Sequence, residues 1–516
     1  MSNPKGSFSP LRSYLWPIYR FELKKFLPLL AMAFFIGFNY NILRNMKDAL
    51  LVTAEGSGAE VLPFIKVWGI LPGAILMTYL YSRLNNRLKR EKVFYVMVGI
   101  FLSFFTLFTF VIYPIRESLH PHATADTLQS LLPAGFKGMV AMFRYWTFSS
   151  FYIMSELWSS AILSMLFWGF ANEVTKLGEA KRFYGLIALG LNMAAITSGQ
   201  VSFFLTGSFV RERWTFTESE WHQSIIILTC VILLSGFAIM GIYRYLTHNI
   251  LSKEASRDPD YTPPPKIKMS MRDNFKILAK SKPLFYLAII VLTYNVVINL
   301  VEVIWKDQVR SLYPDPNHYN AYLSQITTIT GVISFFLSLL FSGQFIRKFG
   351  WTWGAMFTPL VLLFTSIGFF FFFFGKESLV GTLTIFGTSP LALVVFFGST
   401  QNCLARASKF TLFDSTKEMA FIPLSMDLKR KGKAAIDGVG SRLGKSGGSL
   451  VHQGLLLIFA SISASAPFVA GILFVVILFW MGAVLTLGKQ FHFLTDPLPS
   501  PTPQPQNQEP ETATAS

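Results

Sequence analysis

Ten charged side chains lie inside, or at the edge of, segments that are otherwise apolar enough to cross a bilayer. The basic ones are Arg44, Lys47, Lys66, Lys306, Arg442 and Lys445, and the acidic ones are Asp48, Glu156, Glu302 and Asp437. A charge at the bilayer centre costs at least ~2.5–3.5 kcal/mol, so such residues usually face a partner or a water-filled path. Ion pairs can neutralise four charges of each sign, which leaves two cations over. A path lined by surplus cations predicts an anionic cargo.

The clearest polar pattern lies in the apolar segment 284–306. Asn295, Asn299, Glu302 and Lys306 follow one another at spacings of four, three and four, so a helix places them on one face. A polar stripe on a helix in lipid must face protein or water. The stripe therefore either forms hydrogen bonds between helices or lines a transport cavity.

Two cations near the end of the apolar segment 26–49 leave two interpretations open. Arg44 and Lys47 could belong to the same path, or they could mark the outer interface by extending their head groups to water. Glu156 lies in the middle of another apolar segment, where it could pair with a cation, take up a proton, or do both in turn. Lys66, in PFIKVWGILP, is its expected partner by sign.

The string GVGSRLGKSGG (438–448) resembles a phosphate-binding loop only superficially. Its glycine spacing is one residue too short, and no strand precedes it. In a helix, Gly440, Gly444 and Gly448 form a face of small residues suited to close packing. Arg442 and Lys445 would then project toward a central cavity, where Lys can bind phosphate as a point charge and Arg bidentately.

Composition places these residues in a membrane protein. The chain has 516 residues, of which 52% are hydrophobic and 14% charged, against roughly 25% charged in a soluble domain. The net charge of +17 reflects basic loops gathered on one side of the membrane, so we expect no nucleic-acid partner. No metal-ligand cluster or catalytic motif is evident, so we expect neither an enzyme nor a cofactor.

The apolar pattern predicts an all-α polytopic protein with twelve transmembrane helices in two pseudo-symmetric six-helix bundles, a major-facilitator-like architecture. Tyr40-Asn41 in the first helix and Tyr294-Asn295 in the seventh support the repeat. We expect a cytoplasmic segment 1–25, bundles 26–246 and 284–488, a cytoplasmic linker 247–283 and a disordered tail 489–516, with both termini cytoplasmic. The helices are predicted near 26–49, 61–82, 93–113, 141–171, 184–207, 222–246, 284–306, 321–346, 352–374, 379–402, 434–460 and 464–488.

Four long strings carry a family resemblance. They are residues 44–74, 167–186, 294–309 and 409–449. They resemble the nucleotide transporters of plastids and obligate intracellular bacteria, the chlamydial members in particular, and the resemblance covers about residues 26–490. It implies exchange of external ATP for internal ADP, often with phosphate, by alternating access across a bacterial inner membrane. We also expect a monomer to be the working unit.

The resemblance also assigns residues. The family's important intramembrane charges correspond to Lys66 in PFIKVW, Glu156 in SELW, Glu302 in NLVEVIWK and Lys445 in RLGKSGG. An asparagine associated with nucleotide choice corresponds to Asn299 or Asn295. Some relatives instead import several nucleotides with protons, and this alternative stays open at the level of sequence, with Glu156 as the proton carrier.

Overall fold

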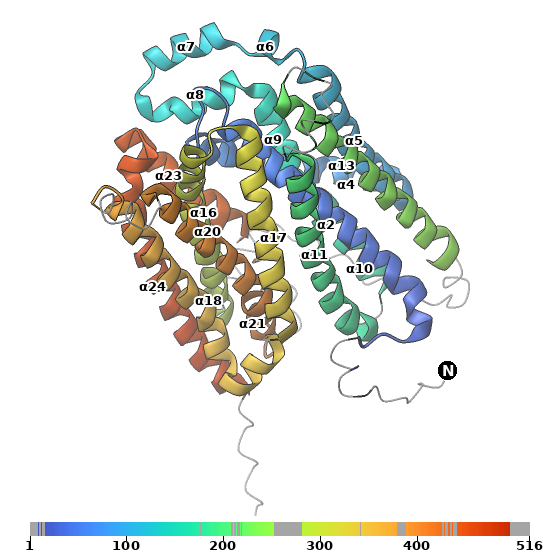
Figure 1. Cartoon of the computed structure of the whole chain (residues 1–516). Helices are drawn as coiled ribbons and strands as arrows, with labels where there is room; N and C mark the ends of the chain where they lie inside the picture. The colour runs from blue at the N-terminus through green and yellow to red at the C-terminus, as the bar shows by residue number, and fades with distance from the viewer. Residues whose placement is uncertain are drawn as a thin grey trace, which may run out of the picture.

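A computed structural model of the chain gives a wholly helical molecule across the residues that it describes (Figure 1). The helices of the N-terminal half, blue to green, lie beside those of the C-terminal half, yellow to red. The described residues are 9, 12, 16–175, 177–207, 210, 213, 217, 219–251, 281–340, 342–378, 389–425, 428, 432, 433, 436 and 441–495.

The N-terminal half contains six long helical segments and an insertion. The segments are α2 (Leu23–Val52); α3 (Val61–Phe64) continued by η2 (Ile65–Ile70) and α4 (Leu71–Arg87); α5 (Arg90–Leu107) with η3 (Phe108–Ile112); α9 (Trp146–Trp158) with η5 (Ser159–Phe167) and α10 (Trp168–Val174); α11 (Leu177–Leu205); and α13 (Glu220–Tyr245) with η6 (Leu246–Leu251). The insertion comprises α6 (Arg116–Leu119), α7 (His122–Leu131), η4 (Ala134–Phe136) and α8 (Lys137–Arg144).

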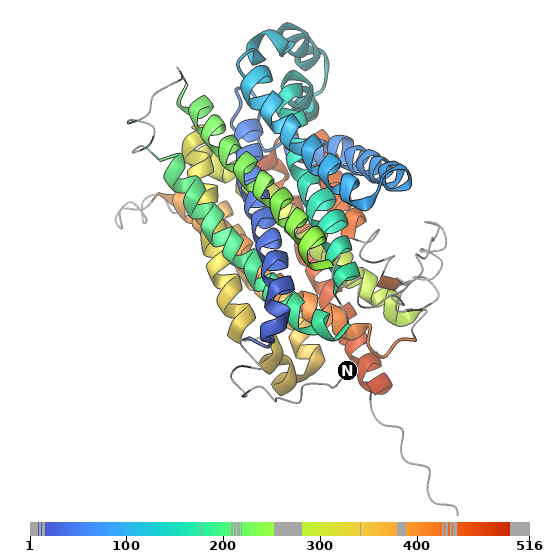
Figure 2. The same cartoon turned by 90° about the vertical axis from the view of Figure 1, so that its right-hand side faces the viewer.

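The C-terminal half follows the same plan without the insertion. Its elements are α16 (Lys282–Leu312), α17 (Pro316–Leu340), α18 (Ser342–Gly375), α20 (Pro390–Ser408) with η7 (Lys409–Phe413) and α21 (Asp414–Ala420), α23 (Ser441–Phe459) and α24 (Ile462–Thr495). Gly350 breaks α18 with a φ of 81°, a left-handed conformation that glycine adopts without a steric penalty. Figure 2 shows the long helices running between the insertion and the end of the molecule where α2 begins.

Ten helical segments in the described ranges are long and apolar enough to cross a bilayer. They correspond to ten of the twelve predicted spans. The predicted tenth and eleventh spans correspond to α20 and α23, which are 19 residues each and carry more polar side chains. The predicted starts at 379 and 434 fall on residues outside the described ranges, as do most of the predicted linker and tail.

Two predicted boundaries are wrong for physical reasons. The fourth span begins at Trp146 instead of 141, because Tyr145 leaves the helical conformation with φ −103° and ψ 47° and separates α8 from α9. The tenth span continues past 402 to Phe413 through η7. That extension brings into the span residues that the sequence pattern assigns to a cytoplasmic loop.

Three wide helical turns lie close to intramembrane charges. Lys66 lies within η2, η5 begins three residues after Glu156, and η7 begins three residues after Arg406, and all three are π-helical. Each π-turn inserts one extra residue and rotates the next residues about the helix axis, and such turns are frequent at functional sites. The turn in η2 therefore changes the face of its helix that Lys66 occupies, and the turns in η5 and η7 rotate the residues that follow Glu156 and Arg406.

The two halves meet along a polar contact between α11 and α17, which we call the seam. Ser324 Oγ and Asn320 Nδ2 donate to Ser202 Oγ at 3.0 and 3.2 Å, and Gln200 Nε2 donates to Thr328 Oγ1 at 3.0 Å. Gln200 and Ser202 lie near the end of α11, and Asn320, Ser324 and Thr328 lie in the first half of α17, and these parts of the two helices face the insertion end (Figure 1). The seam therefore joins the halves at the insertion end of the molecule.

Glycine makes this close approach possible. A Cβ atom at Gly199 would lie 2.5 Å from the carbonyl oxygen of Ser324 and 3.0 Å from the backbone nitrogen of Thr328. A Cβ at Gly331 would lie 2.9 Å from the backbone nitrogen of Ile196. Small residues that let helix backbones touch are the usual device for tight packing in membranes.

Candidate functional site

Seven of the ten predicted intramembrane charges come together between the halves. With one further residue they form what we call the charged cluster: Arg44, Lys47, Asp48, Lys66, Glu156, Glu302, Lys306 and Arg406. Four of these residues come from α2 and η2, one from α9, two from α16 and one from α20. The side chains of Arg442 and Lys445 and all of Asp437 lie outside what the structure describes.

Glu302 lies at the centre of the cluster and has four basic neighbours. Its Oε2 lies 3.1 Å from Lys66 Nζ. Its Oε1 lies 3.1 Å from Lys306 Nζ, 3.5 Å from Arg406 Nη2 and 3.9 Å from Arg44 Nη2. Two of these cations belong to the N-terminal half and two to the C-terminal half, so one carboxylate links both.

Asp48 is a second and more deeply buried centre. Its two oxygens lie 2.8 Å from Lys306 Nζ and 3.2 Å from Lys47 Nζ. The three side chains are only 2–3% exposed. A buried charge is strongly destabilising unless it is paired, so Asp48 holds two lysines that would otherwise be costly.

Arg44 and Lys47 do not extend to an interface, so the snorkelling alternative is wrong. Lys47 is buried, contacts Asp48 and Glu156, and lies 3.6 Å from the centre of the Tyr152 ring. Arg44 approaches Glu302. Both residues belong to the charged cluster because α2 directs them inward.

The expected pairing of Lys66 with Glu156 is also wrong. Lys66 forms its ion pair with Glu302 and donates to Asn299 Oδ1 at 2.9 Å. Glu156 Oε2 instead lies 3.4 Å from Lys47 Nζ. The sign of a charge predicted that a partner exists, but helix packing selects which one. With a quarter of its side chain exposed, Glu156 is the most accessible member of the cluster.

The polar stripe of α16 faces the other helices, as its spacing predicted. Asn299 accepts from Lys66 and donates to Ser449 Oγ of α23 at 2.9 Å. Asn295 donates to the carbonyl oxygen of Val291 one turn earlier. Gly444 and Gly448 pack directly on α16, where added Cβ atoms would lie 2.8 Å from Asn295 Cβ and 3.1 Å from Asn299 Cβ. The predicted small-residue face of the eleventh span is confirmed at these two glycines.

Arg406 is the member that sequence reasoning missed. The predicted tenth span ended at 402, which placed Arg406 among the basic residues of a loop. In the structure α20 continues to Ser408 and carries the guanidinium to Glu302. The uninterrupted string NCLARASKFTLF (402–413), with a single arginine in its apolar first half, was the available signal.

The cluster holds five cations and three carboxylates, so its described members carry two positive charges in excess. Most of these groups are withdrawn from water, where charge interactions act more strongly than in bulk solvent. Arg44, Lys66 and Arg406 each keep about a sixth of the side chain exposed. The arrangement is suited to holding a compact polyanion.

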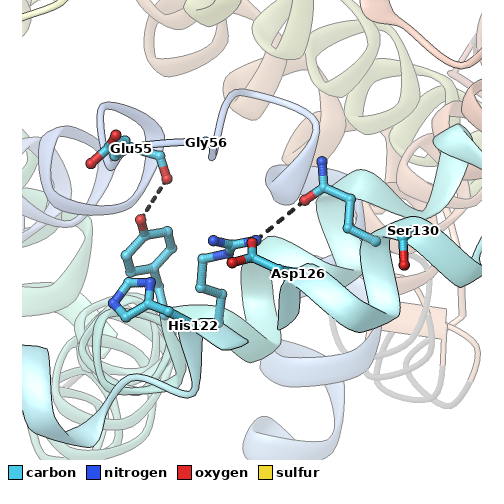
Figure 3. A pocket seen from close by; sticks show the side chains of 8 residues that line it. Glu55, Gly56, His122, Asp126 and Ser130 are labelled. Carbon is cyan, nitrogen blue, oxygen red and sulfur yellow. Dashed lines mark hydrogen bonds and ion pairs between the residues drawn. The ribbon is translucent and has the colours of Figure 1, made fainter. Parts of the chain in front are cut away.

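A separate hollow of about 640 Å³ lies under the insertion (Figure 3). Arg144 and two acidic residues, Glu55 and Asp126, line it with His122 and Tyr145. Arg144 already donates to Asp126 at 2.5 Å, and Tyr145 donates to the Glu55 carbonyl oxygen at 2.5 Å. This hollow lacks the cation excess of the charged cluster and contains none of the predicted site residues.

Comparison with known proteins gives a consistent result along nearly the whole chain. Residues 1–491 match the sequence model of the family described as TLC ATP/ADP transporter. The chain is 47% identical over 497 residues to ADP,ATP carrier protein 2 of Chlamydia pneumoniae, covering 94% of this chain and 92% of that protein. It is 43% identical to the plastidic ATP/ADP-transporter of Solanum tuberosum, covering 91% of this chain and 73% of that protein.

Solved structures are similar in fold alone. A D-xylose-proton symporter superposes with a TM-score of 0.52 at 11% identity, covering 90% of this chain and 97% of that one. An inward-facing bacterial homologue of the iron transporter ferroportin gives a TM-score of 0.51 at 14% identity, covering 93% and 100%. The major-facilitator-like architecture predicted from the helix pattern is confirmed.

Proposed function

This chain belongs to the TLC ATP/ADP transporter family and is a carrier that imports ATP in exchange for ADP, and we propose that the charged cluster is the site that holds the nucleotide's polyphosphate. It is a transporter and not an enzyme. The observation that carries the proposal is the convergence of four cations, two from each half, on the single carboxylate of Glu302.

We propose that Glu302 and Glu156 occupy the anion positions when the site is empty. Each buried cation then keeps a partner, which avoids the cost of an unpaired charge. Phosphate oxygens displace the carboxylates, and the cluster's excess positive charge favours a cargo with more negative charge than those carboxylates supply. Lys66 is well placed for this exchange because it contacts Glu302 from the opposite half.

We propose that α23 adds Lys445 and Arg442 to the same site. Support comes from the close packing of Gly444 and Gly448 on α16 beside Asn295 and Asn299. Asn299 touches both Lys66 and α23, which favours it over Asn295 as the amide that contributes to nucleotide choice. Whether phosphate accompanies ADP depends on the same cations, since inorganic phosphate would use the same donors.

Transport then requires the halves to open alternately around the site. The seam closes the insertion end, together with Gly135 of η4, where an added Cβ would lie 2.6 Å from Leu457 Cα in α23. A ligand shifts such an equilibrium only through contacts that differ between the two states. A polyphosphate that bridges cations of both halves supplies that difference.

We further propose that the protein works as a monomer in the cell inner membrane with both termini in the cytoplasm. Arg87 ends α4, and Lys89, Arg90 and Lys92 lie between it and the first turn of α5, whose other end leads through η3 to the insertion. Short basic loops mark the cytoplasmic side. A cysteine introduced at exposed Glu55 should therefore react with an impermeant thiol reagent added from outside.

The decisive experiment is counter-exchange in proteoliposomes. Labelled ATP uptake should require internal ADP and should fall at least tenfold in Lys66→Gln and Lys445→Gln, while Lys348→Gln, an exposed lysine outside the cluster, retains it. Normal exchange by Lys66→Gln and Lys445→Gln would refute the proposal that the charged cluster binds the nucleotide. Uptake into vesicles without nucleotide, driven by a pH gradient and abolished in Glu156→Gln, would replace exchange with proton-coupled import.

A further inference from the structure

Arg406, like Arg44, is held more loosely than the lysines of the charged cluster. Lys66 has Asn299 as a second partner at 2.9 Å, and Lys306 has Asp48 at 2.8 Å. Among the described residues, the one ion pair of Arg406 is the 3.5 Å contact with Glu302 Oε1. A guanidinium has five N–H donors in a planar fork, so most of its hydrogen-bonding capacity remains unused.

The position of Glu302 Oε1 is the focus of three cations. Lys306, Arg406 and Arg44 lie 3.1, 3.5 and 3.9 Å from this one oxygen, whereas Lys66 contacts the other oxygen. An oxygen of a phosphate group that took this position would lie within reach of both halves at once. Arginine can form two parallel hydrogen bonds to a phosphate. The 3.5 Å contact between Arg406 and Glu302 does not use this paired geometry.

We propose that Arg406 is a phosphate ligand of the transported nucleotide. Phosphate oxygens would displace Glu302 Oε1 and would be bound by Arg406 together with Lys306 and Arg44. This rests on the proposed function of the charged cluster. Because α20 packs against α16, α17 and α18, a contact of this kind ties the cargo to the body of the C-terminal half. Arg44 ties the same phosphate to α2 in the other half.

The competing explanation is that Arg406 only neutralises Glu302. The two explanations make different predictions once that carboxylate is removed. A pure counter-ion has no function without its partner, so Arg406→Gln would have no further effect in a Glu302→Gln background. If Arg406 is a phosphate ligand, Arg406→Gln should weaken nucleotide binding by the same factor whether residue 302 is Glu or Gln.

The test is equilibrium binding of ADP and adenosine to the purified full-length carrier in lipid nanodiscs. Loss of one charged hydrogen-bonding group predicts ADP binding about 10- to 100-fold weaker in Arg406→Gln. Arg406→Lys, which keeps the charge and loses the fork, should lie between this variant and the unmodified protein. Adenosine has no phosphate, so its binding should change less than twofold.

Lys409→Gln is the matched control. Lys409 is one turn further along, carries the same charge as Arg406 and pairs with Asp414 at 3.4 Å away from the cluster. Its ADP affinity should stay within about twofold of the unmodified carrier, since solvent-exposed pairs contribute little.

The outcomes separate this proposal from the one on which it rests. Equal ADP affinity with and without Arg406→Gln in the Glu302→Gln background overturns the phosphate role. If Lys66→Gln weakens ADP binding while Arg406→Gln does not, Arg406 is excluded and the cluster stands. If neither variant changes ADP binding, the cluster is not the nucleotide site at all.

Discussion

The seam gives the sharpest prediction, because a single methyl group at Gly199 should hold the insertion end open. The added Cβ would lie 2.5 Å from the backbone oxygen of Ser324, and an ordinary contact begins near 3.4 Å. A side-chain rotation of Thr328 cannot relieve a clash with backbone atoms, so α17 must retreat by about 0.9 Å. The same substitution leaves the charged cluster untouched.

That retreat removes the seam's hydrogen bonds. The four bonds that join Ser202 and Gln200 to α17 are 3.0–3.2 Å long, and about 0.9 Å more takes them beyond bonding distance. Each is worth ~0.5–1.5 kcal/mol, which gives about 2–6 kcal/mol against closure. Water replaces these partners once the seam opens, so we expect the lower limit. About 2 kcal/mol changes the ratio of closed to open carrier roughly 30-fold.

The measurement is a distance distribution between spin labels at Glu55→Cys and Asp315→Cys, which are exposed on the two halves at the insertion end. The natural Cys230 and Cys403 are first replaced. Gly199→Ala should lengthen the main distance and slow counter-exchange. Gly241→Ala is the matched control, because its Cβ would meet nothing within 4 Å. An unchanged distribution in Gly199→Ala would refute the reasoning that this packing closes the carrier.

Two further predictions concern stability. Asp48→Asn leaves Lys47 and Lys306 buried with one carboxylate each, and should lower the unfolding free energy by about 3–5 kcal/mol. The measurement is the melting temperature in detergent, which should fall. As a control, Asp126→Asn, in the more exposed pair with Arg144, should lower the unfolding free energy by less than about 1 kcal/mol. Burial lowers the pKa of His120, in the insertion, to about 4, so the unfolded chain binds the proton more readily than the folded one. The contribution of neutral His120 to stability is complete above about pH 6.5 and declines as pH falls through 4. His120→Gln should therefore flatten the fall in melting temperature over that pH range.

A melting temperature unchanged in Asp48→Asn would mean that the two lysines find other partners. An acid-induced fall that is as steep in His120→Gln as in the unmodified protein would place the responsible proton elsewhere.

The sequence predicted that buried charges exist and which helices carry them, but not how they pair. Charged residues are rare in membrane-spanning segments because the bilayer excludes water, so Glu302 and Lys66 could be identified from the apolar sequence around them. Their contact depends on how η2 packs against α9 and α23, and the π-turn at Lys66 rotates the side chain in a way that an ideal helical period does not express. Arg406 was missed for a simpler reason, since a boundary predicted at 402, four residues before it, turned a cluster member into a loop residue.

Gly199 illustrates a different limit. A glycine in an apolar segment has many explanations, and only the position of α17 shows that this one is required for contact. The small-residue face of α23 was predictable because three glycines repeat at intervals of four. Close approach of two helices can therefore be predicted when it is periodic, and not when it rests on one residue.

The two excess positive charges of the cluster also have an electrical consequence. Transferring one charge across the membrane potential involves about 2.3 kcal/mol per 100 mV, so an empty site that carries two would need ~4.6 kcal/mol to turn outward against an interior-negative potential. ADP carries roughly three negative charges, which offset the positive charge of the site and so reduce that work. The potential itself would then discourage the unloaded return and enforce one-for-one exchange. Collapsing the potential in vesicles should increase one-way ATP uptake, and an unchanged rate would show that the empty carrier moves no net charge.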